Sequence, residues 1–377
     1  MDNILLSGGL SFIITFFAIP VIIQVAKEKK LFDEPDERKL HKAVIPTLGG
    51  LGIFAGFIMA TLIGAPQSGS SSLQYFVAAS IVIFFLGLKD DVLILSASKK
   101  FIGQLIAAGI LIKFGGVQIN NMYGFLGIYN IPNVASIVLS TFTIIVITNS
   151  FNLIDGVDGL AGSLGVLTTL CFGLYFYFDG DMPFAVMAFA LSGSLLSFLI
   201  YNFPPAKIFM GDTGSLLVGL INSILVIKFI NTASQPGAVI HFQSAPAIGF
   251  AVLMIPLLDT LRVFGLRILS RRSPFSPDRN HIHHFLIDLG LSHKYTSLLC
   301  LAANLFFILV AVIFDGMGTT ILLSVLIVTG FAATGLVYNL RQKKMRKKNP
   351  MLEALQEKDV VKSRQILNLA SENVEVD

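Results

Sequence analysis

The sequence predicts an all-α polytopic membrane protein with about eleven transmembrane helices, an N-terminus outside and a C-terminus in the cytoplasm. Composition predicts the class, because 54% of the 377 residues are hydrophobic and 13% are charged, against about 25% charged residues in a soluble domain. The mean hydropathy is +0.78. The distribution of Lys and Arg along the chain predicts the orientation.

Apolar runs recur along most of the chain, and each approaches the roughly 20 residues that a spanning helix requires. We expect eleven spans, at residues 5–26, 47–65, 74–88, 99–115, 134–149, 159–178, 184–200, 213–230, 246–266, 296–314 and 318–338. A β-barrel would show shorter segments of alternating polarity instead. The first run is predicted to be an uncleaved helix, because its Lys residues follow it rather than precede it.

Lys and Arg accumulate in the cytoplasmic loops of membrane proteins. With the N-terminus outside, 24 of the 27 basic residues fall in inner loops or at the helix ends that border them. We expect residues 1–340 to form the integral membrane domain and residues 341–377 to form a basic cytoplasmic tail, partly disordered, in which residues 349–377 form either a short helix or a disordered segment. The run RQKKMRKK at 341–348 is expected to anchor the last helix at an anionic leaflet. The net charge of +4 reflects this bias and does not indicate nucleic-acid binding.

Most of the reactive side chains are concentrated in five predicted inner loops, which we expect to form the walls of one cytoplasm-facing site. The loops contain EPDERKLHKAVIPTLGG in 27–46, KDD in 89–98, SFNLIDGVDG in 150–158, YNFPPAKIFMGD in 201–212 and SPFSPDRNHIHH in 267–295. The adjacent aspartates of KDD, taken alone, would be typical of a solvated helix end. Adjacent aspartates at a helix C-terminus oppose the macrodipole, however, so a divalent cation or a lysine is expected to compensate them.

Two further motifs suggest a phosphate or metal site. Asn152, Asp155 and Asp158 recur every three residues, so in a helical turn they would share one ridge, at a cost near a membrane unless they bind something. The stretch IFMGDTGSLLVG resembles a phosphate-binding turn at a helix N-terminus. The alternative is that Asp212 or Thr213 simply caps the eighth helix.

Three histidines occur within four positions, at His281, His283 and His284, and they suit metal binding, acid–base work or phosphate contacts better than an inert interfacial loop. Oxygen-rich ligands without a nearby cysteine indicate Mg²⁺, with Mn²⁺ as a substitute, rather than zinc. The basic residues that suit a diphosphate are Lys42, Lys99, Lys100, Lys207 and Arg279. Together these features predict a metal-dependent enzyme acting on a phosphorylated substrate at the cytoplasmic membrane surface.

The five motifs HKAVIPTLGG, LGLKDD, NSFNLIDGVDGLAGS, NFPPAKIFMGDTGSLLVG and SPFSPDRNHIHH resemble those of the bacterial polyprenyl-phosphate N-acetylhexosamine-1-phosphate transferases. These are relatives of the phospho-N-acetylmuramoyl-pentapeptide transferase. The resemblance spans residues from about 27 to 340, with the motifs in the same order. It implies that a nucleotide-activated amino sugar and a membrane polyprenyl phosphate give a polyprenyl-diphospho-sugar and a nucleoside monophosphate, with Mg²⁺.

Within that family, PDRNHIHH resembles the branch that starts O-antigen, enterobacterial common antigen or teichoic acid synthesis. The implied partners are UDP-GlcNAc, undecaprenyl phosphate and membrane lipid, at the bacterial inner (cytoplasmic) membrane. UDP-GalNAc and a 6-deoxy amino sugar stay open as alternatives, and so does a homodimer. The resemblance implies no nucleic-acid partner.

The resemblance also implies roles for individual residues. It implies catalytic roles for Asp90, Asp91, Asp155 and His283, with the first two at the lipid phosphate and Asp155 lining the diphosphate and the metal. It implies a metal site at Asp212 and Asn152. It implies that Lys42 and Lys100 contact the diphosphate. It implies that Asn202 and Phe209 contact the uracil, with Asp158 nearby. It implies that the loop of Arg279, His281, His283 and His284 contacts the sugar phosphates.

Two mechanisms are compatible with these residues. Either Asp90 or Asp91 attacks the β-phosphorus and forms an aspartyl-phosphate, or the lipid phosphate attacks directly, which we favour. A transporter is a rival interpretation, but transporters place polar groups near the bilayer midplane, often within internal repeats. A metal hydrolase would require a His-Glu-x-x-His type of motif, which the sequence lacks.

Overall fold

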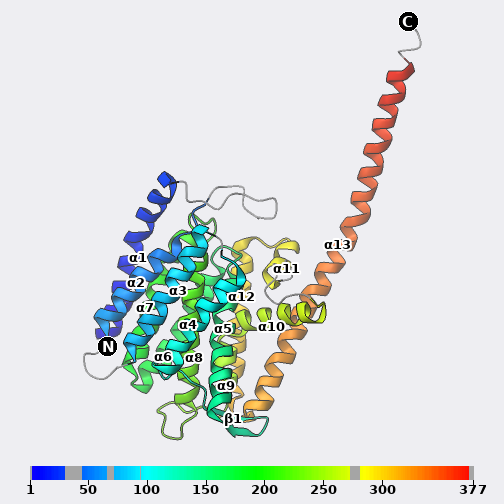
Figure 1. The fold of residues 1–377 in the computed structure, drawn as a ribbon. Helices are drawn as coiled ribbons and strands as arrows, with labels where there is room; N and C mark the ends of the chain where they lie inside the picture. Colours follow the sequence, from blue (N-terminus) through cyan, green and yellow to red (C-terminus); the bar gives the residue numbers. More distant parts are fainter. Residues whose placement is uncertain (1, 30–44, 66–71, 94, 272–280, 373–377) are drawn as a thin grey trace.

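The computed structural model describes residues 2–29, 45–65, 72–93, 95–271 and 281–372, with side chains as far as residue 346. The fold is a bundle of long helices (Figure 1). The helices are α1 (Asp2–Lys29), α2 (Gly49–Gly64), α3 (Leu73–Leu93), α4 (Ala97–Lys113), α5 (Asn133–Ile154), α6 (Leu160–Asp179), α7 (Met182–Asn202), α8 (Gly211–Ala233), α9 (Ala245–Val252), α10 (Met254–Leu269), α11 (Ile282–Asp288), α12 (His293–Ile313) and α13 (Thr319–Glu372).

Each predicted span coincides with one of these helices or, at 246–266, with a pair of them. Seven described helices are long and apolar enough to cross a membrane, namely α1, α5, α6, α7, α8, α12 and α13, and the bent pair α9–α10 would make an eighth. The chain is therefore a multi-pass, all-α membrane protein. The count of eleven spans and the orientation in the membrane stay predictions.

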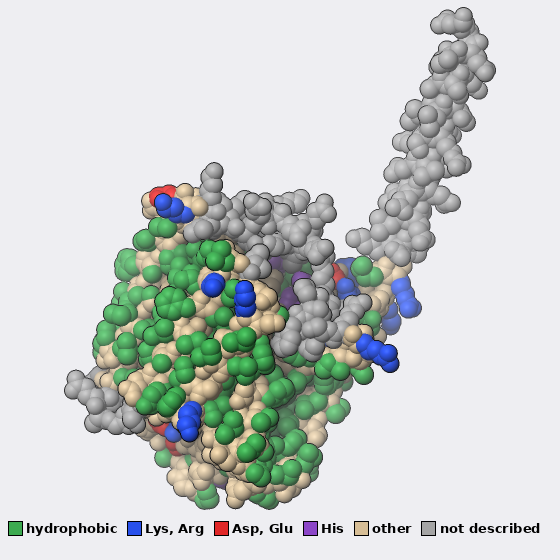
Figure 2. Space-filling model, viewed as in Figure 1, with side chains coloured by type: hydrophobic (Ala, Val, Ile, Leu, Met, Phe, Trp, Pro, Cys, Tyr) green, Lys and Arg blue, Asp and Glu red, His purple; other side chains and the backbone are tan. Residues whose placement is uncertain are grey.

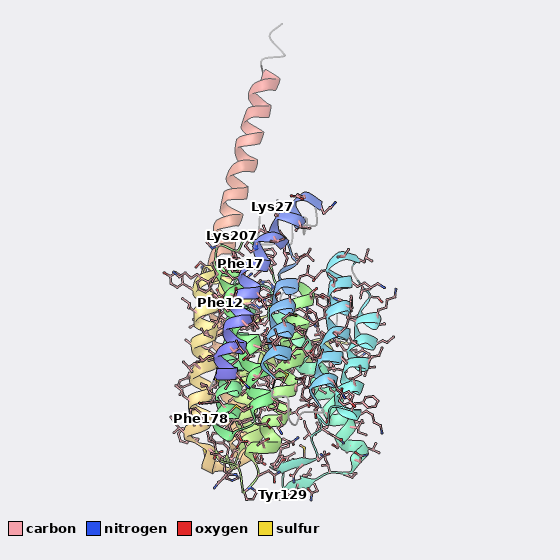
Figure 3. The ribbon with its side chains drawn as sticks, turned by 90° about the vertical axis from the view of Figure 1, so that its left-hand side faces the viewer. Phe12, Phe17, Lys27, Tyr129, Phe178 and Lys207 are labelled. Carbon is pink, nitrogen blue, oxygen red and sulfur yellow. The ribbon has the colours of Figure 1, made fainter. Side chains whose placement is uncertain are left out.

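The two ends of the bundle differ. The N-terminus lies near one end, together with a small antiparallel hairpin of β1 (Asn121–Phe125) and β2 (Ile128–Asn130), and we call this the hairpin end (Figure 1). Helix α11 and the extension of α13 lie at the opposite end, the upper end. Figure 3 places Lys27 and Lys207 at the upper end and Tyr129 at the hairpin end. In Figure 2, histidine side chains are visible near the upper end.

Helix α8 forms the centre of the bundle, with 89% of its most apolar stretch buried. Glycines let neighbouring helices approach its first turn closely. A Cβ added to Gly50 of α2 would lie 2.2 Å from the nitrogen of Gly214, and one on Gly87 of α3 would lie 2.5 Å from Cα of Thr213. Small residues of this kind allow tight backbone packing in membranes. As a result, the start of α8 is enclosed by α2 and α3.

The segment predicted to span the membrane at 246–266 is not one straight helix. The chain breaks at Leu253, and α9 and α10 meet at an angle of 85° (Figure 1). Pro256 in the first turn of α10 lacks an N–H and disfavours a helical conformation in the residue before it. Asn304 of α12 fills the gap, because its amide donates to the oxygen of Val252 and accepts from the nitrogen of Ile255, each at 2.9 Å. Backbone groups freed inside a membrane need such partners.

The tail also differs from the simplest expectation. Helix α13 continues without interruption from Thr319 to Glu372, so the boundary expected at residue 340 falls inside a helix. Residues 373–377 lie outside the described part, and the basic cytoplasmic tail stays a prediction. The hairpin and the short helix α11 were not predicted from the sequence.

Candidate active site

The first turn of α8 is capped by an aspartate from another helix. Asp91 of α3 accepts hydrogen bonds from the nitrogens of Asp212 (2.7 Å) and Thr213 (3.0 Å) and from Oγ1 of Thr213 (2.6 Å). Gly211 has φ +70°, and a Cβ there would lie 2.2 Å from the oxygen of Thr47 and 2.8 Å from both Asp91 carboxylate oxygens. The chain therefore requires glycine at this position. Neither Asp212 nor Thr213 caps the helix through its own side chain.

Because Asp91 caps the helix, the Asp212 carboxylate is available to bind side chains from two other helices. Its Oδ2 accepts from Nζ of Lys100 at 2.8 Å, and its Oδ1 accepts from Nδ2 of Asn152 at 2.8 Å. Asn152 also donates to Oγ of Ser215 at 3.0 Å. Lys100 forms a second ion pair with Asp90 of α3. Of the two compensating groups expected for the aspartate pair, a divalent cation or a lysine, the structure supplies a lysine, Lys100, at Asp90.

Asp155 lies immediately after the end of α5 and is partly buried. Its nitrogen donates to the oxygen of Asn152 at 3.4 Å, and within the described residues its carboxylate has no hydrogen-bond or ion-pair partner. Burial, together with the negative charges of Asp212, Asp91 and Asp158, raises the pKa of Asp155 well above its usual value. A carboxyl group in this position would be stabilised in its charged form by a cation.

The predicted ridge of Asn152, Asp155 and Asp158 is not formed, because α5 ends at Ile154 and a turn follows. Gly159, with φ +75°, allows that turn. Asp158 instead accepts a long hydrogen bond from the nitrogen of Ala206 (3.4 Å), and its Oδ1 lies 3.3 Å from Nδ1 of His293. It therefore joins the loop after α5 to the loop after α7 and to α12.

The two residues predicted to contact uracil hold loops together. Asn202 accepts from the nitrogen of Gly159 and donates to the oxygen of Ile208, each at 2.9 Å, so both ends of its amide are used within the protein. The backbone of Phe209 donates to Pro46 (2.7 Å) and accepts from Gly49 (2.9 Å), and its side chain is partly exposed. The uracil contacts stay predictions, and for Asn202 the structure adds a role in fixing the loops.

The three histidines lie at the start of α11 and reach the same region. His283 is 1% exposed, and a Cβ added to Gly156 would lie 2.8 Å from its Nε2, so the ring rests on the turn after α5. The ring centroid of His283 lies 5.5 Å from that of His281 and 4.4 Å from that of His284. Burial, reinforced by His284, lowers the pKa of His283 to about 3. His283 is therefore uncharged near neutral pH.

Asp259 is a site residue that the sequence analysis missed. Its Oδ2 lies 2.7 Å from Nδ1 of His281, and its Oδ1 accepts from the nitrogen of Ile282 and from Nη2 of Arg262, each at 2.9 Å. Asp259 occurs inside the predicted span 246–266, where no loop marks it. The available signal was an ionisable residue three positions from Arg262 in an apolar segment, which is costly unless the two pair.

The structure therefore brings together most of the predicted site residues. Asp90, Asp91, Lys100, Asn152, Asp155 and Asp212 surround the start of α8, and His283 packs on the turn that follows Asp155. Lys42 and Arg279 lie outside the described residues, so their predicted roles are untested.

The donor set suits a hard divalent cation. Within the described residues, no group of three His, Cys, Asp or Glu side chains is arranged to enclose a metal. Mg²⁺ does not require such a cage, because it commonly keeps several waters and binds one or two carboxylates with substrate phosphates. Asp155, Asp212 and the amide oxygen of Asn152 are oxygen donors of that kind.

The chain matches the model of glycosyl transferase family 4 over residues 73–230, from α3 into α8. It is 34% identical over 321 residues to the decaprenyl-phosphate N-acetylglucosaminephosphotransferase of Mycobacterium leprae (strain TN), which covers 79% of this chain and 80% of that relative. The chain belongs to glycosyl transferase family 4. The family region holds Lys100, Asn152 and Asp212, whereas the histidine helix lies beyond it.

Other relatives of this family 4 protein have related names. The "Probable undecaprenyl-phosphate N-acetylglucosaminyl 1-phosphate transferase" of Bacillus subtilis (strain 168) is 32% identical over 334 residues, covering 87% of this chain and 89% of the relative. The undecaprenyl-phosphate alpha-N-acetylglucosaminyl 1-phosphate transferase of Salmonella typhi is 28% identical over 314 residues, covering 82% and 81%. All three names describe transfer of a sugar phosphate to a polyprenyl phosphate.

Proposed function

We propose that this family 4 protein transfers N-acetylglucosamine 1-phosphate from UDP-GlcNAc to undecaprenyl phosphate, giving undecaprenyl-diphospho-GlcNAc and UMP. The reaction would start a cell-surface polysaccharide at the cytoplasmic face of the bacterial inner membrane. One observation carries the proposal: Lys100, Asn152 and Asp212 meet at the start of α8, at one end of the bundle. The relatives' names give the donor sugar and the polyprenyl acceptor.

The surroundings of the aspartate pair support direct attack by the lipid phosphate. Both carboxylate oxygens of Asp91 hold the start of α8. Asp90 accepts from the nitrogen of Leu95 at 2.5 Å through one oxygen and pairs with Lys100 through the other. A phosphate monoester with a second pKa of about 6 is already largely dianionic at neutral pH, so it requires orientation more than activation.

In this mechanism the protein positions the phosphates and offsets their charge, as is typical of phosphoryl transfer. Lys100 supplies positive charge beside Asp90 and Asp212. Asp212 and Asn152, with Asp155 beside them, would hold Mg²⁺ or Mn²⁺. When bound, the metal would neutralise negative charge on the diphosphate. Neutral His283, which lies on the turn after Asp155, would contact the sugar-phosphate end of the substrate.

The arrangement at one end of the bundle also favours an enzyme over a transporter, whose polar groups lie near the midplane. The test is incubation of the purified protein with undecaprenyl phosphate, Mg²⁺ and a panel of labelled UDP-sugars. We expect lipid-linked product from UDP-GlcNAc and exchange of labelled UMP into UDP-GlcNAc. Product from UDP-GalNAc or a 6-deoxy sugar alone would replace the donor in the proposal, and the absence of exchange with every donor would refute transfer.

A further inference from the structure

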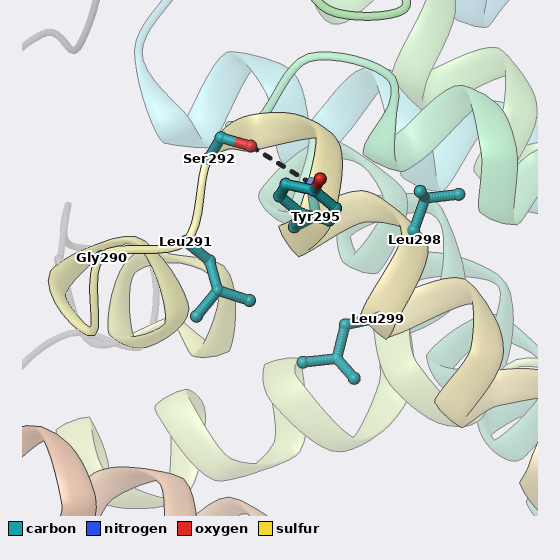
Figure 4. A pocket seen from close by; sticks show the side chains of 6 residues that line it. All are labelled: Gly290, Leu291, Ser292, Tyr295, Leu298 and Leu299. Carbon is teal, nitrogen blue, oxygen red and sulfur yellow. Dashed lines mark hydrogen bonds between the residues drawn. The ribbon is translucent and has the colours of Figure 1, made fainter.

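Helix α11, which carries the histidines, has seven residues and cannot be stable by itself. Its neighbours must therefore hold it. On the side of α12, the turn that leaves α11 borders a pocket of about 600 Å³, lined by Gly290, Leu291, Ser292, Tyr295, Leu298 and Leu299 (Figure 4). An open pocket at this turn provides little packing to fix the end of α11.

Helix α13 holds α11 from another side. Arg341 donates from Nε to Oδ2 of Asp288, in the last turn of α11, at 2.6 Å. Lys344 donates from Nζ to the oxygen of Leu289, the residue after the helix, at 2.8 Å. Cations at a helix C-terminus interact favourably with the macrodipole, whereas Asp288 alone would oppose it. Arg341 and Lys344 therefore complete the end of α11.

The same arginine reaches the buried face of α11. The ring of Phe285, which is 1% exposed, has the guanidinium of Arg341 4.7 Å from its centroid and that of Arg262 4.8 Å away. Cation–π contacts of this kind are attractive, more so when desolvated. Arg262 in turn pairs with Asp259, which holds His281. Contacts thus run without a gap from α13 to the first histidine.

We propose that the Tyr338–Lys344 segment of α13, which we call the strut, positions the histidine helix, and that Arg341 is a positioning residue for the reaction. The proposal rests on the proposed function in one respect, because that function makes the histidines substrate contacts. The basic run at 341–348 was expected to anchor α13 to the membrane. That anchoring stays a prediction, and two members of the run also bind α11 within the protein.

Arg341→Ala tests the strut in the assay for transfer. We expect kcat/KM for UDP-GlcNAc to fall about tenfold, equivalent to about 1.4 kcal/mol, while UMP binding stays unchanged. Lys343→Ala and Arg346→Ala are matched controls, since both residues are exposed on the same helix, and each should retain wild-type kcat/KM. A twofold or smaller effect of Arg341→Ala, or an equal loss in the controls, would overturn the proposal.

A charge exchange separates positioning from a general loss of folding. Arg341→Glu should lose activity, and adding Asp288→Arg should recover a large part of it by restoring the ion pair with reversed signs. Recovery would support the strut. A double variant no better than Arg341→Glu alone would argue against it.

Hydrogen exchange provides a readout that does not depend on activity. In Arg341→Ala, the amides of residues 284–290 should exchange faster than in the wild type, while those at the start of α8 should not change. Unchanged exchange in α11 would refute the strut. If exchange increases but the wild-type protein transfers no sugar phosphate, the strut stands and the proposed function fails.

Discussion

Asp91 caps the helix that carries Asp212, with its Oδ1 accepting from the Asp212 nitrogen at 2.7 Å. Asp91 thus holds the backbone at the start of α8. The carboxylate of Asp212 can therefore bind Lys100 and Asn152. The resemblance to known transferases assigns both aspartates to the chemistry. The structure distinguishes them by their partners.

If Asp91 is mainly a cap, Asp91→Ala should destabilise the protein by about 0.5–2 kcal/mol, as loss of a helix cap does. Activity should fall with it, because Asp212 loses its position. Asp91→Asn, which keeps one acceptor oxygen, should lose less of both. Thermal unfolding in detergent and initial rates measure the two effects. An inactive Asp91→Asn variant with an unchanged unfolding temperature would indicate a chemical role instead.

Asp212→Asn should reduce turnover to below about a tenth of wild type, since it removes a charged ligand from the ion expected to neutralise the transition state. The protein should remain folded, because the Asp91 cap contacts the backbone of residue 212 and not its side chain. Asp181→Asn makes the same chemical change at the ion pair with Lys228, remote from the site, and should retain activity. If Asp212→Asn keeps more than about a tenth of wild-type turnover at saturating Mg²⁺, the metal assignment is refuted.

Direct attack requires both substrates on the enzyme together. Initial rates measured against UDP-GlcNAc at several concentrations of undecaprenyl phosphate should therefore give intersecting reciprocal plots. Parallel lines, or release of UMP without the lipid, would be the result expected of an aspartyl-phosphate intermediate.

His283 predicts a specific dependence of stability on pH. Its pKa is lowered to about 3 in the folded protein, so the unfolded chain binds the proton first. Stability should fall as pH drops below about 6.5 and continue to fall towards about pH 3, by at most about 1.4 kcal/mol per unit. Between pH 7.5 and 5.5, the wild type should lose more thermal stability than His283→Gln. His241→Gln, at an exposed histidine, is the control and should behave as the wild type does.

The sequence was most informative about features that depend only on composition and on the order of motifs along the chain. Apolar runs located the long helices of the bundle, and the order of five motifs located the loops that surround the start of α8. Polar contacts across the bundle were harder to predict. The break at Leu253 depends on Asn304, which is 51 residues away (304 − 253) in another apolar helix. Asp259 was missed for a similar reason, since its partner His281 is 22 residues further along the chain and meets it only in the folded protein.

Helix α13 is one unbroken rod, tied at the hairpin end by Thr319, whose Oγ1 donates to the oxygen of Tyr123 at 3.0 Å. From that pivot to Arg341 the rod is about 33 Å long, at about 1.5 Å per residue, so a tilt of about 5° moves its far end by about 3 Å. Such a displacement exceeds what the 2.6 Å contact with Asp288 could survive. Arg341 and Asp288 therefore help to fix the angle of the rod, together with the Lys344 contact to Leu289, as much as the rod fixes the short helix beside it.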